Sequence, residues 1–241
     1  KSIVLRISSI RLIISLAAGF LAAHWFAGLG WSVSGVYSAI VLATGPTVVT
    51  PLVRQIRLAS PLSDVLEAEG LILEPVGAVL ALLLLELVVG DLHGWRELFL
   101  GLLSRLGGGV LIGLFAGLLL SEALKRLRSE PYIGLRLQLT LGVVFLLYGV
   151  CEWLLPESGL PASVAAGFVV GQRPSTQANE LDKLIRELAQ LAITMLFPLL
   201  AADVSWGELS PLGWGGVTCV LFLMIVVRPL AVAIATYGLP L

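Results

Sequence analysis

The sequence predicts an all-α integral membrane protein with about eight transmembrane helices. Of its 241 residues, 58% are hydrophobic and only 13% are charged, and the mean hydropathy is +0.99. A soluble domain of this length carries about 25% charged residues. Several apolar stretches also reach the roughly 20 residues that a helix needs to cross a bilayer. The net charge of −1 offers no basic excess for nucleic acid, and we expect neither an enzyme nor a cofactor.

The predicted helices form a single transmembrane domain over residues 1–241. In chain order, their spans lie near residues 8–28, 33–54, 66–89, 98–122, 132–155, 159–172, 184–205 and 214–237. The sixth span is short, which indicates a steeply placed or partly re-entrant segment. In the fourth span, Gly109, Gly113 and Gly117 recur every four residues, a spacing typical of close helix packing in lipid.

Basic residues alternate between loops, which predicts an orientation under the positive-inside rule. They cluster at the start of the first span, after the second and fourth spans, and around the loop between the sixth and seventh: Lys1, Arg6, Arg11, Arg54, Arg57, Lys125, Arg126, Arg128, Arg173, Lys183 and Arg186. Near the opposite ends lie tryptophans that fit an interfacial belt: Trp31, Trp95, Trp153, Trp206 and Trp214. Both ends of the chain should therefore be cytoplasmic.

Glu74 is the acidic residue that the sequence places near the middle of the bilayer. The third span enters from the cytoplasm near Asp64, so Glu74 lies about 15 Å deep at the helical rise per residue. Pro75 follows it, removes a backbone donor and crowds the carbonyl of Leu71, so we expect a kink that frees a carbonyl oxygen for a cation. A charged group at this depth is costly and marks a candidate functional site.

The second span is interrupted at a similar depth. Gly45 and Pro46 break the helix, while Thr44 and Thr47 add hydroxyl oxygens. Broken backbone at membrane depth is tolerated where it is buried in protein or lines a cavity. A broken helix beside a buried carboxylate is typical of the substrate site of secondary transporters. The alternative explanation is a proline kink together with an acid that pairs with Arg228.

Other charged residues also fall within the apolar spans. Arg228, followed by Pro229, lies about 14 residues into the eighth span and stays charged at any working pH. It can balance Glu74 or bind the end of a broken helix, and the sequence does not choose between these. Arg105 can extend toward water or pair internally, whereas Asp203 lies near the end of its span.

Glu67 and Glu69 precede Glu74 near the predicted cytoplasmic mouth. Glu67 and Glu74 lie about two turns apart on one helix face. The two acids therefore form either a funnel for cations or the solvated start of the helix.

Three stretches of the sequence resemble the monovalent cation:proton antiporters, the sodium/proton exchanger family of bacteria and eukaryotes. They are Ala43-Thr44-Gly45-Pro46-Thr47-Val48-Val49, Glu67-Ala68-Glu69-Gly70-Leu71-Ile72-Leu73-Glu74-Pro75-Val76-Gly77 and Arg228-Pro229-Leu230. In many members the first reads Thr-Asp-Pro and the second reads Glu-Gly-Glu-Ser-Leu-Leu-Asn-Asp-Ala-Val-Gly. The Thr-Gly-Pro of this chain is similar to a bacterial subgroup. The resemblance covers essentially the whole chain.

The resemblance implies a role for each matched residue. It assigns ion and proton binding to Glu74, Thr44, Gly45 and Thr47, and charge balance to Arg228. The family fold has about thirteen helices in an inverted repeat with two broken helices. In that frame three helices are missing upstream and two downstream, so the chain is expected to be a fragment.

Exchange of Na+ or K+ for protons is the activity that the resemblance implies, with the carboxylate of Glu74 holding either ion in turn. Gly45 and Leu73 stand where many members have Asp and Asn, which leaves Glu74 largely alone and favours one-for-one exchange. The resemblance also implies a lipid bilayer, expected to be the bacterial inner membrane, and a homodimer of the intact protein. A channel or symporter, or a transport-inactive sensor or assembly subunit, are the alternative functions.

Overall fold

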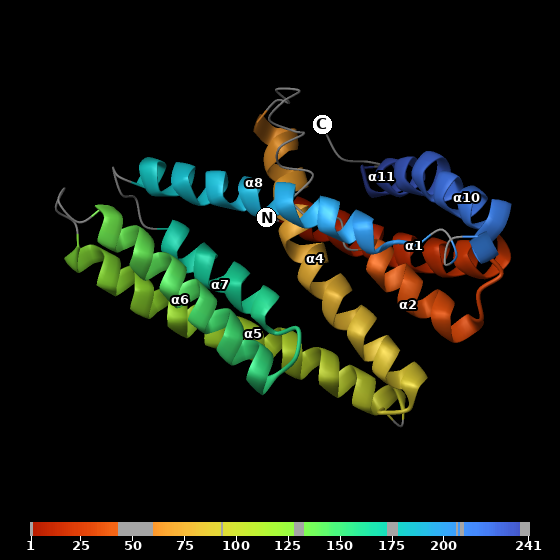
Figure 1. Cartoon of the computed structure of the whole chain (residues 1–241), viewed down its shortest axis with the longest axis horizontal. Coiled ribbons are helices and arrows are strands. Elements are labelled where there is room, and N and C mark those ends of the chain that lie inside the picture. The colour runs from red at the N-terminus through yellow and green to blue at the C-terminus, as the bar shows by residue number, and fades with distance from the viewer. Residues whose placement is uncertain are drawn as a thin grey trace. The chain divides into compact units, whose positions relative to one another are not determined.

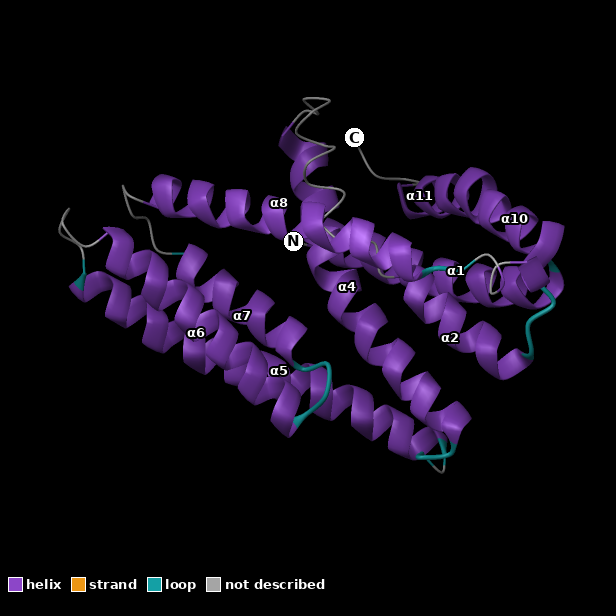
Figure 2. Ribbon diagram, in the orientation of Figure 1, coloured by secondary structure: helices purple, strands orange, loops and turns teal. Residues whose placement is uncertain are grey.

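The structure is a computed structural model that describes residues 2–42, 60–92, 94–127, 133–172, 178–205, 207 and 210–236. All regular secondary structure in these ranges is helical (Figure 2). Six helices are long and apolar enough to cross a membrane, and two shorter apolar helices accompany them. The predicted fold class, an all-α integral membrane protein, is confirmed.

The described part of the chain has long helices with short connections (Figure 1). They are α1 (Ser2–Trp25), α2 (Trp31–Leu42), α4 (Ser60–Val89), α5 (Trp95–Arg126), α6 (Ile133–Leu154), α7 (Gly159–Gly171), α8 (Ala178–Asp203), α10 (Gly213–Phe222) and α11 (Arg228–Thr236), with a 3₁₀ turn η2 (Ser210–Leu212) and a π-helical turn η3 (Leu223–Val227).

Several helices extend beyond the spans that hydropathy predicts. α4 begins at Ser60 rather than near residue 66, and α5 continues to Arg126 rather than ending near residue 122. Hydropathy marks only the apolar core of a helix, whereas the backbone stays helical into the polar interface. α2 ends at Leu42, and the rest of its predicted span lies outside the described residues.

The chain divides into two compact units, here called the first unit (Lys1–Gly101 with Trp206–Leu241) and the second unit (Leu102–Ser205). In the first unit, α1 packs against α2, α4, η3 and α11, and α2 packs against α4. Its buried cluster joins Ala22 of α1 to three residues of α10 and η3: Cys219, Leu223 and Val227. α1 is therefore the helix around which the described part of the first unit is built.

The second unit is held by a seam between α5 and α7. A Cβ built on Gly113 would overlap the carbonyl oxygen of Ala162, and one built on Gly109 would lie 2.5 Å from the carbonyl oxygen of Ser158. Gly117 meets α7 in the same way. Only hydrogen side chains allow backbones this close, so the predicted role of the three glycines in helix packing is confirmed.

Glu152 fixes the start of α7. Its carboxylate accepts the backbone N–H of Glu157 at 2.9 Å and that of Gly159 at 3.2 Å. The hydroxyl of Ser158 donates to the carbonyl of Cys151 at 3.1 Å. These bonds satisfy backbone groups that a helix start otherwise leaves exposed, and they orient α7 for its contact with α5.

Candidate functional site

α4 carries the three acids that the sequence singles out. Glu74 lies at the middle of this 30-residue helix, which runs without interruption through Pro75. The Glu74 side chain is half-buried, and its neighbours Leu73 and Pro75 are buried. No hydrogen bond or ion pair joins the side chain of Glu74 to the rest of the described chain. Such a carboxylate is suited to bind a proton or a cation, because either one removes the cost of an isolated buried charge.

Pro75 leaves one backbone hydrogen bond of α4 unmade. It has no N–H to donate to the carbonyl of Leu71, one helical turn earlier. α4 nevertheless stays helical on both sides of it. The kink predicted at Pro75 stays a prediction.

Glu69 forms an ion pair that the sequence did not predict. Nη1 of Arg11, on α1, lies 2.5 Å from Oε2 of Glu69. The Arg11 side chain is 13% exposed and that of Glu69 is 4% exposed, so the pair is almost fully removed from solvent. A buried carboxylate is tolerated when a cation and hydrogen bonds accompany it, and Arg11 provides both.

Arg228 begins α11 immediately after the π-helical turn η3. Its backbone N–H donates to the carbonyl of Leu223, five residues earlier, rather than to the residue four positions back. Pro229 follows, and its ring would crowd the carbonyl of Ile225 in a regular α-helix. The wider turn relieves this crowding. π-helical turns of this kind are frequent at functional sites.

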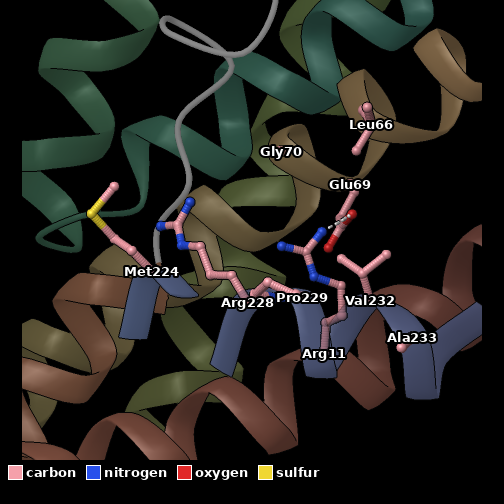
Figure 3. Close-up of a pocket in the computed structure, with 9 residues that line it drawn as sticks. All are labelled: Arg11, Leu66, Glu69, Gly70, Met224, Arg228, Pro229, Val232 and Ala233. Carbon is pink, nitrogen blue, oxygen red and sulfur yellow. Dashed lines mark hydrogen bonds and ion pairs between the residues drawn. The ribbon is translucent and has the colours of Figure 1, made fainter. Parts of the chain in front are cut away.

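Arg11, Glu69 and Arg228 line one cavity of about 560 Å³ within the first unit. Figure 3 shows the guanidinium of Arg11 directed at Glu69, while that of Arg228 extends into the same cavity without pointing at this pair. The remaining lining comes from α4, η3 and α11: Leu66, Gly70, Met224, Pro229, Val232 and Ala233. The side chain of Arg228 has no hydrogen bond or ion pair to the described residues, and Glu74 is not part of the lining.

Thr44, Gly45 and Thr47, with Pro46, lie outside the described residues, as does the predicted break in the second span. α2 ends at Leu42, directly before this segment. Among the predicted site residues that the structure does describe, it brings Glu69 and Arg228 to one cavity and leaves Glu74 further along α4. Glu67 is half-buried at the same end of α4 as Glu69.

The other charged residues considered from sequence lie elsewhere. Arg105 acts electrostatically on Glu157, in the connection between α6 and α7, which favours internal pairing for Arg105. Asp203 is the last residue of α8 and is exposed. Within the described ranges, no group of three or more His, Cys, Asp or Glu side chains is arranged to hold a metal ion.

Arg11 is a cavity-lining residue that the sequence pattern does not identify as part of a site. The positive-inside pattern groups Arg11 with the basic residues at the cytoplasmic start of the first span, but α1 begins at Ser2 and places Arg11 well inside the helix. The early start of α1 could have been predicted from the absence of helix breakers. No proline or glycine interrupts the chain before Gly19, so a helix can start well before the apolar core.

A family model described as sodium/hydrogen exchanger, transmembrane, matches residues 1–241. The chain belongs to the sodium/hydrogen exchanger family. It is thus an integral multi-pass membrane protein of a transporter family, as the resemblance of its motifs predicted. The assignment to a Thr-Gly-Pro subgroup stays a prediction.

Curated relatives of this exchanger-family chain carry matching names. It is 25% identical over 213 residues to "Probable Na(+)/H(+) antiporter 2" of Methanocaldococcus jannaschii, covering 83% of this chain and 49% of the relative. It is 24% identical over 248 residues to Na(+)/H(+) antiporter 1 of the same organism, covering 98% and 57%. It is 24% identical over 226 residues to the Na(+)/H(+) antiporter NhaH of Halobacillus aidingensis, covering 89% and 55%. The chain spans about half the length of these relatives.

Proposed function

We propose that the protein exchanges a monovalent cation, Na+ or K+, for protons across a membrane, by competition at the carboxylate of Glu74. The observation that carries this proposal is the half-buried Glu74 in the middle of a helix long enough to cross the membrane, without a counter-ion among the described residues. The names of the antiporters that this chain resembles support Na+ and protons as the exchanged ions.

Competition follows from the cost of charge at membrane depth. An ionised carboxylate there is stabilised either by a proton or by a cation, and each excludes the other. If the protein exposes the site to the opposite side only when one of the two is bound, a cation moving one way is exchanged for a proton moving the other way. Motion of one helix bundle against another around a fixed site is the usual means in this class of transporter.

The ligands proposed beside Glu74 are few. Thr44, Gly45 and Thr47 are assigned to the site through the broken helix, and they supply hydroxyl and backbone oxygens. Leu73 is 2% exposed and apolar, so the position next to Glu74 offers no side-chain oxygen. A site with a single acid supports one-for-one exchange, in which the charge of the site is the same whichever ion is bound.

The proposed setting is a bacterial inner membrane, with both ends of the chain cytoplasmic and a homodimer in the intact protein. The exposed tryptophans at helix ends support the position of these ends at a membrane interface, and the orientation rests on the basic residues of the loops. Trp31 and Trp95 begin α2 and α5, and Trp153 lies near the end of α6. All three are exposed and lie at the ends predicted to face outward, as interfacial anchors do.

The test replaces Glu74 in the full-length protein reconstituted in proteoliposomes. Glu74→Gln keeps the shape of the side chain but cannot be ionised, and we expect it to abolish proton movement driven by a Na+ or K+ gradient. Glu74→Asp keeps the carboxylate and should retain exchange with a changed apparent KM. A pH-sensitive dye inside the vesicles measures the exchange.

Glu122→Gln is the matched control, because this acid lies on the exposed surface of α5 in a pair with Lys125. It should exchange like the unmodified protein. Exchange that persists in Glu74→Gln would rule out Glu74 as the shared site. Current that depends on voltage but carries no protons would favour a channel instead.

A further inference from the structure

We infer that Arg11 is a positioning residue for the exchange site, which by neutralising Glu69 leaves Arg228 as the net charge of the cavity and thereby sets the affinity of Glu74 for protons and Na+. This inference rests on the proposed function and adds to it a residue that acts through others. Arg11 lies on α1, two helices before α4 in the chain as described, and nothing in its sequence neighbourhood marks it as part of a site.

The geometry gives Arg11 one specific partner. Its Nη1 contacts Oε2 of Glu69 at 2.5 Å, and both side chains are nearly buried. Oε1 of Glu69 and Nε of Arg11 are buried without a hydrogen-bond partner. A single contact therefore joins the two charges, and the second oxygen of Glu69 stays available to another donor. Arg228 shares the cavity with this pair.

Few charged or titratable groups of the described residues surround Glu69 on the elements that pack against α4. α1 contributes Arg11, and α11 contributes Arg228 across the cavity. α2 contributes no charged residue within Trp31–Leu42, and its Tyr37 is directed at Cys219, whose sulfur lies 4.0 Å from the phenol oxygen. On α4 itself Glu67 is half-buried and has an interaction of its own.

The described charged groups that line the cavity are two guanidinium groups and one carboxylate, which gives a net charge of +1. Glu69 and Glu74 are five residues apart on α4, which places them about 7.5 Å apart along the helix axis and about 140° apart around it. A charge at this range changes the proton affinity of a carboxylate noticeably, because screening is weak away from water. Loss of Arg11 lowers the net charge by one as long as Glu69 stays ionised, as it does when it turns to Arg228.

The experiment compares charge variants in the full-length protein, reconstituted in proteoliposomes and assayed with Na+. Arg11→Gln should move the pH of half-maximal exchange upward by about one unit and lower the apparent KM for Na+ several-fold, since an added negative charge favours both bound ions. Adding Glu69→Gln in the same protein restores the net charge and should reverse both shifts. Arg11→Lys keeps the charge and should leave the pH profile in place.

A second single variant gives the opposite sign. Glu69→Gln alone raises the net charge of the cavity, so the pH midpoint should move downward and the KM for Na+ should rise. Lys125→Gln, which removes a cation from an exposed pair, is the matched control and should shift neither quantity. Melting temperatures identify variants that have lost their fold. If Arg11→Gln is one of them, the shifts measured in Glu69→Gln test the inference by themselves.

A lower maximal rate without a shift in the pH midpoint or KM would show that Arg11 has only a structural role. Shifts of the same sign in Arg11→Gln and Glu69→Gln would also overturn the inference. These outcomes are separate from the fate of the proposed function. If Glu74→Gln abolishes exchange and Arg11→Gln shifts nothing, only the inference fails; if Glu74→Gln retains exchange, the proposed function fails.

Discussion

The two units of the chain hold their helices together by opposite means. In the first unit, α1 and α4 are joined by the charged pair of Arg11 and Glu69 beside a cavity. In the second unit, α5 and α7 meet through glycine, with backbone against backbone and no charge at the contact. The first kind of contact responds to pH and to cations, whereas the second responds to neither.

This difference separates adjustable contacts from fixed ones. A buried ion pair balances a large desolvation cost against a large attraction, so one lost partner upsets it. A glycine seam gains from close van der Waals packing and fails only when volume is added. We therefore expect the contact near the proposed ion site to be the sensitive one.

The largest effect on stability should come from breaking the charged pair. Arg11→Leu leaves the Glu69 carboxylate buried without its cation, and we expect a loss of about 3 kcal/mol in the free energy of unfolding. Arg11→Leu combined with Glu69→Leu should recover most of that loss, because an apolar pair needs no compensation. The free energies of unfolding of the two single variants and the double variant are measured on the purified protein in detergent. If the losses of the single variants simply add in the double variant, the pair contributes nothing specific.

A smaller loss should follow from adding one methyl group to the seam. Gly113→Ala places a Cβ against the backbone carbonyl of Ala162, which cannot move as a side chain can, so we expect a loss of about 1–3 kcal/mol. Gly107→Ala in the same helix is the control, since a Cβ there meets nothing within 4 Å. Equal stabilities of the two variants would contradict the seam as the structure shows it.

The smallest effect concerns Glu157, which lies outside the membrane-spanning helices. Burial raises the pKa of its carboxyl above the ordinary 4.5, the charge of Glu152 raises it further, and Arg105 partly offsets this. A carboxyl with a raised pKa holds its proton more tightly in the folded state. Its contribution to stability is complete below the ordinary value and is lost as the pH rises through the folded value.

Glu157→Gln should therefore remove a slight decline in melting temperature between about pH 4.5 and neutrality, the window above the ordinary carboxyl pKa. Melting curves of the two proteins over this range test it, with Glu122→Gln as an exposed control. Identical slopes for Glu157→Gln and the unmodified protein would show that the surroundings of Glu157 do not favour its protonated form.

Much of the fold follows from the sequence, because hydropathy and glycine spacing are local. The helices lie where apolar runs predict them, and Gly109, Gly113 and Gly117 pack as their spacing indicates. The pair of Arg11 and Glu69 joins residues 58 positions apart, and no local pattern specifies such a contact. Glu74 was predicted from its depth, from Pro75 beside it and from the family motif, and none of these tells which arginine pairs with which acid.

The π-helical turn also keeps one side of a long helix facing the same neighbour. Buried residues recur at a constant interval of four: Cys219, Leu223, Val227 and Ala231. In a regular α-helix each such step advances about 40° too far, so the stripe would drift by about 120° over its length. The extra residue accommodated by η3 reverses most of this drift. A straight row of small and branched side chains can thus follow α1, and the direction in which Arg228 leaves the helix is set by this correction.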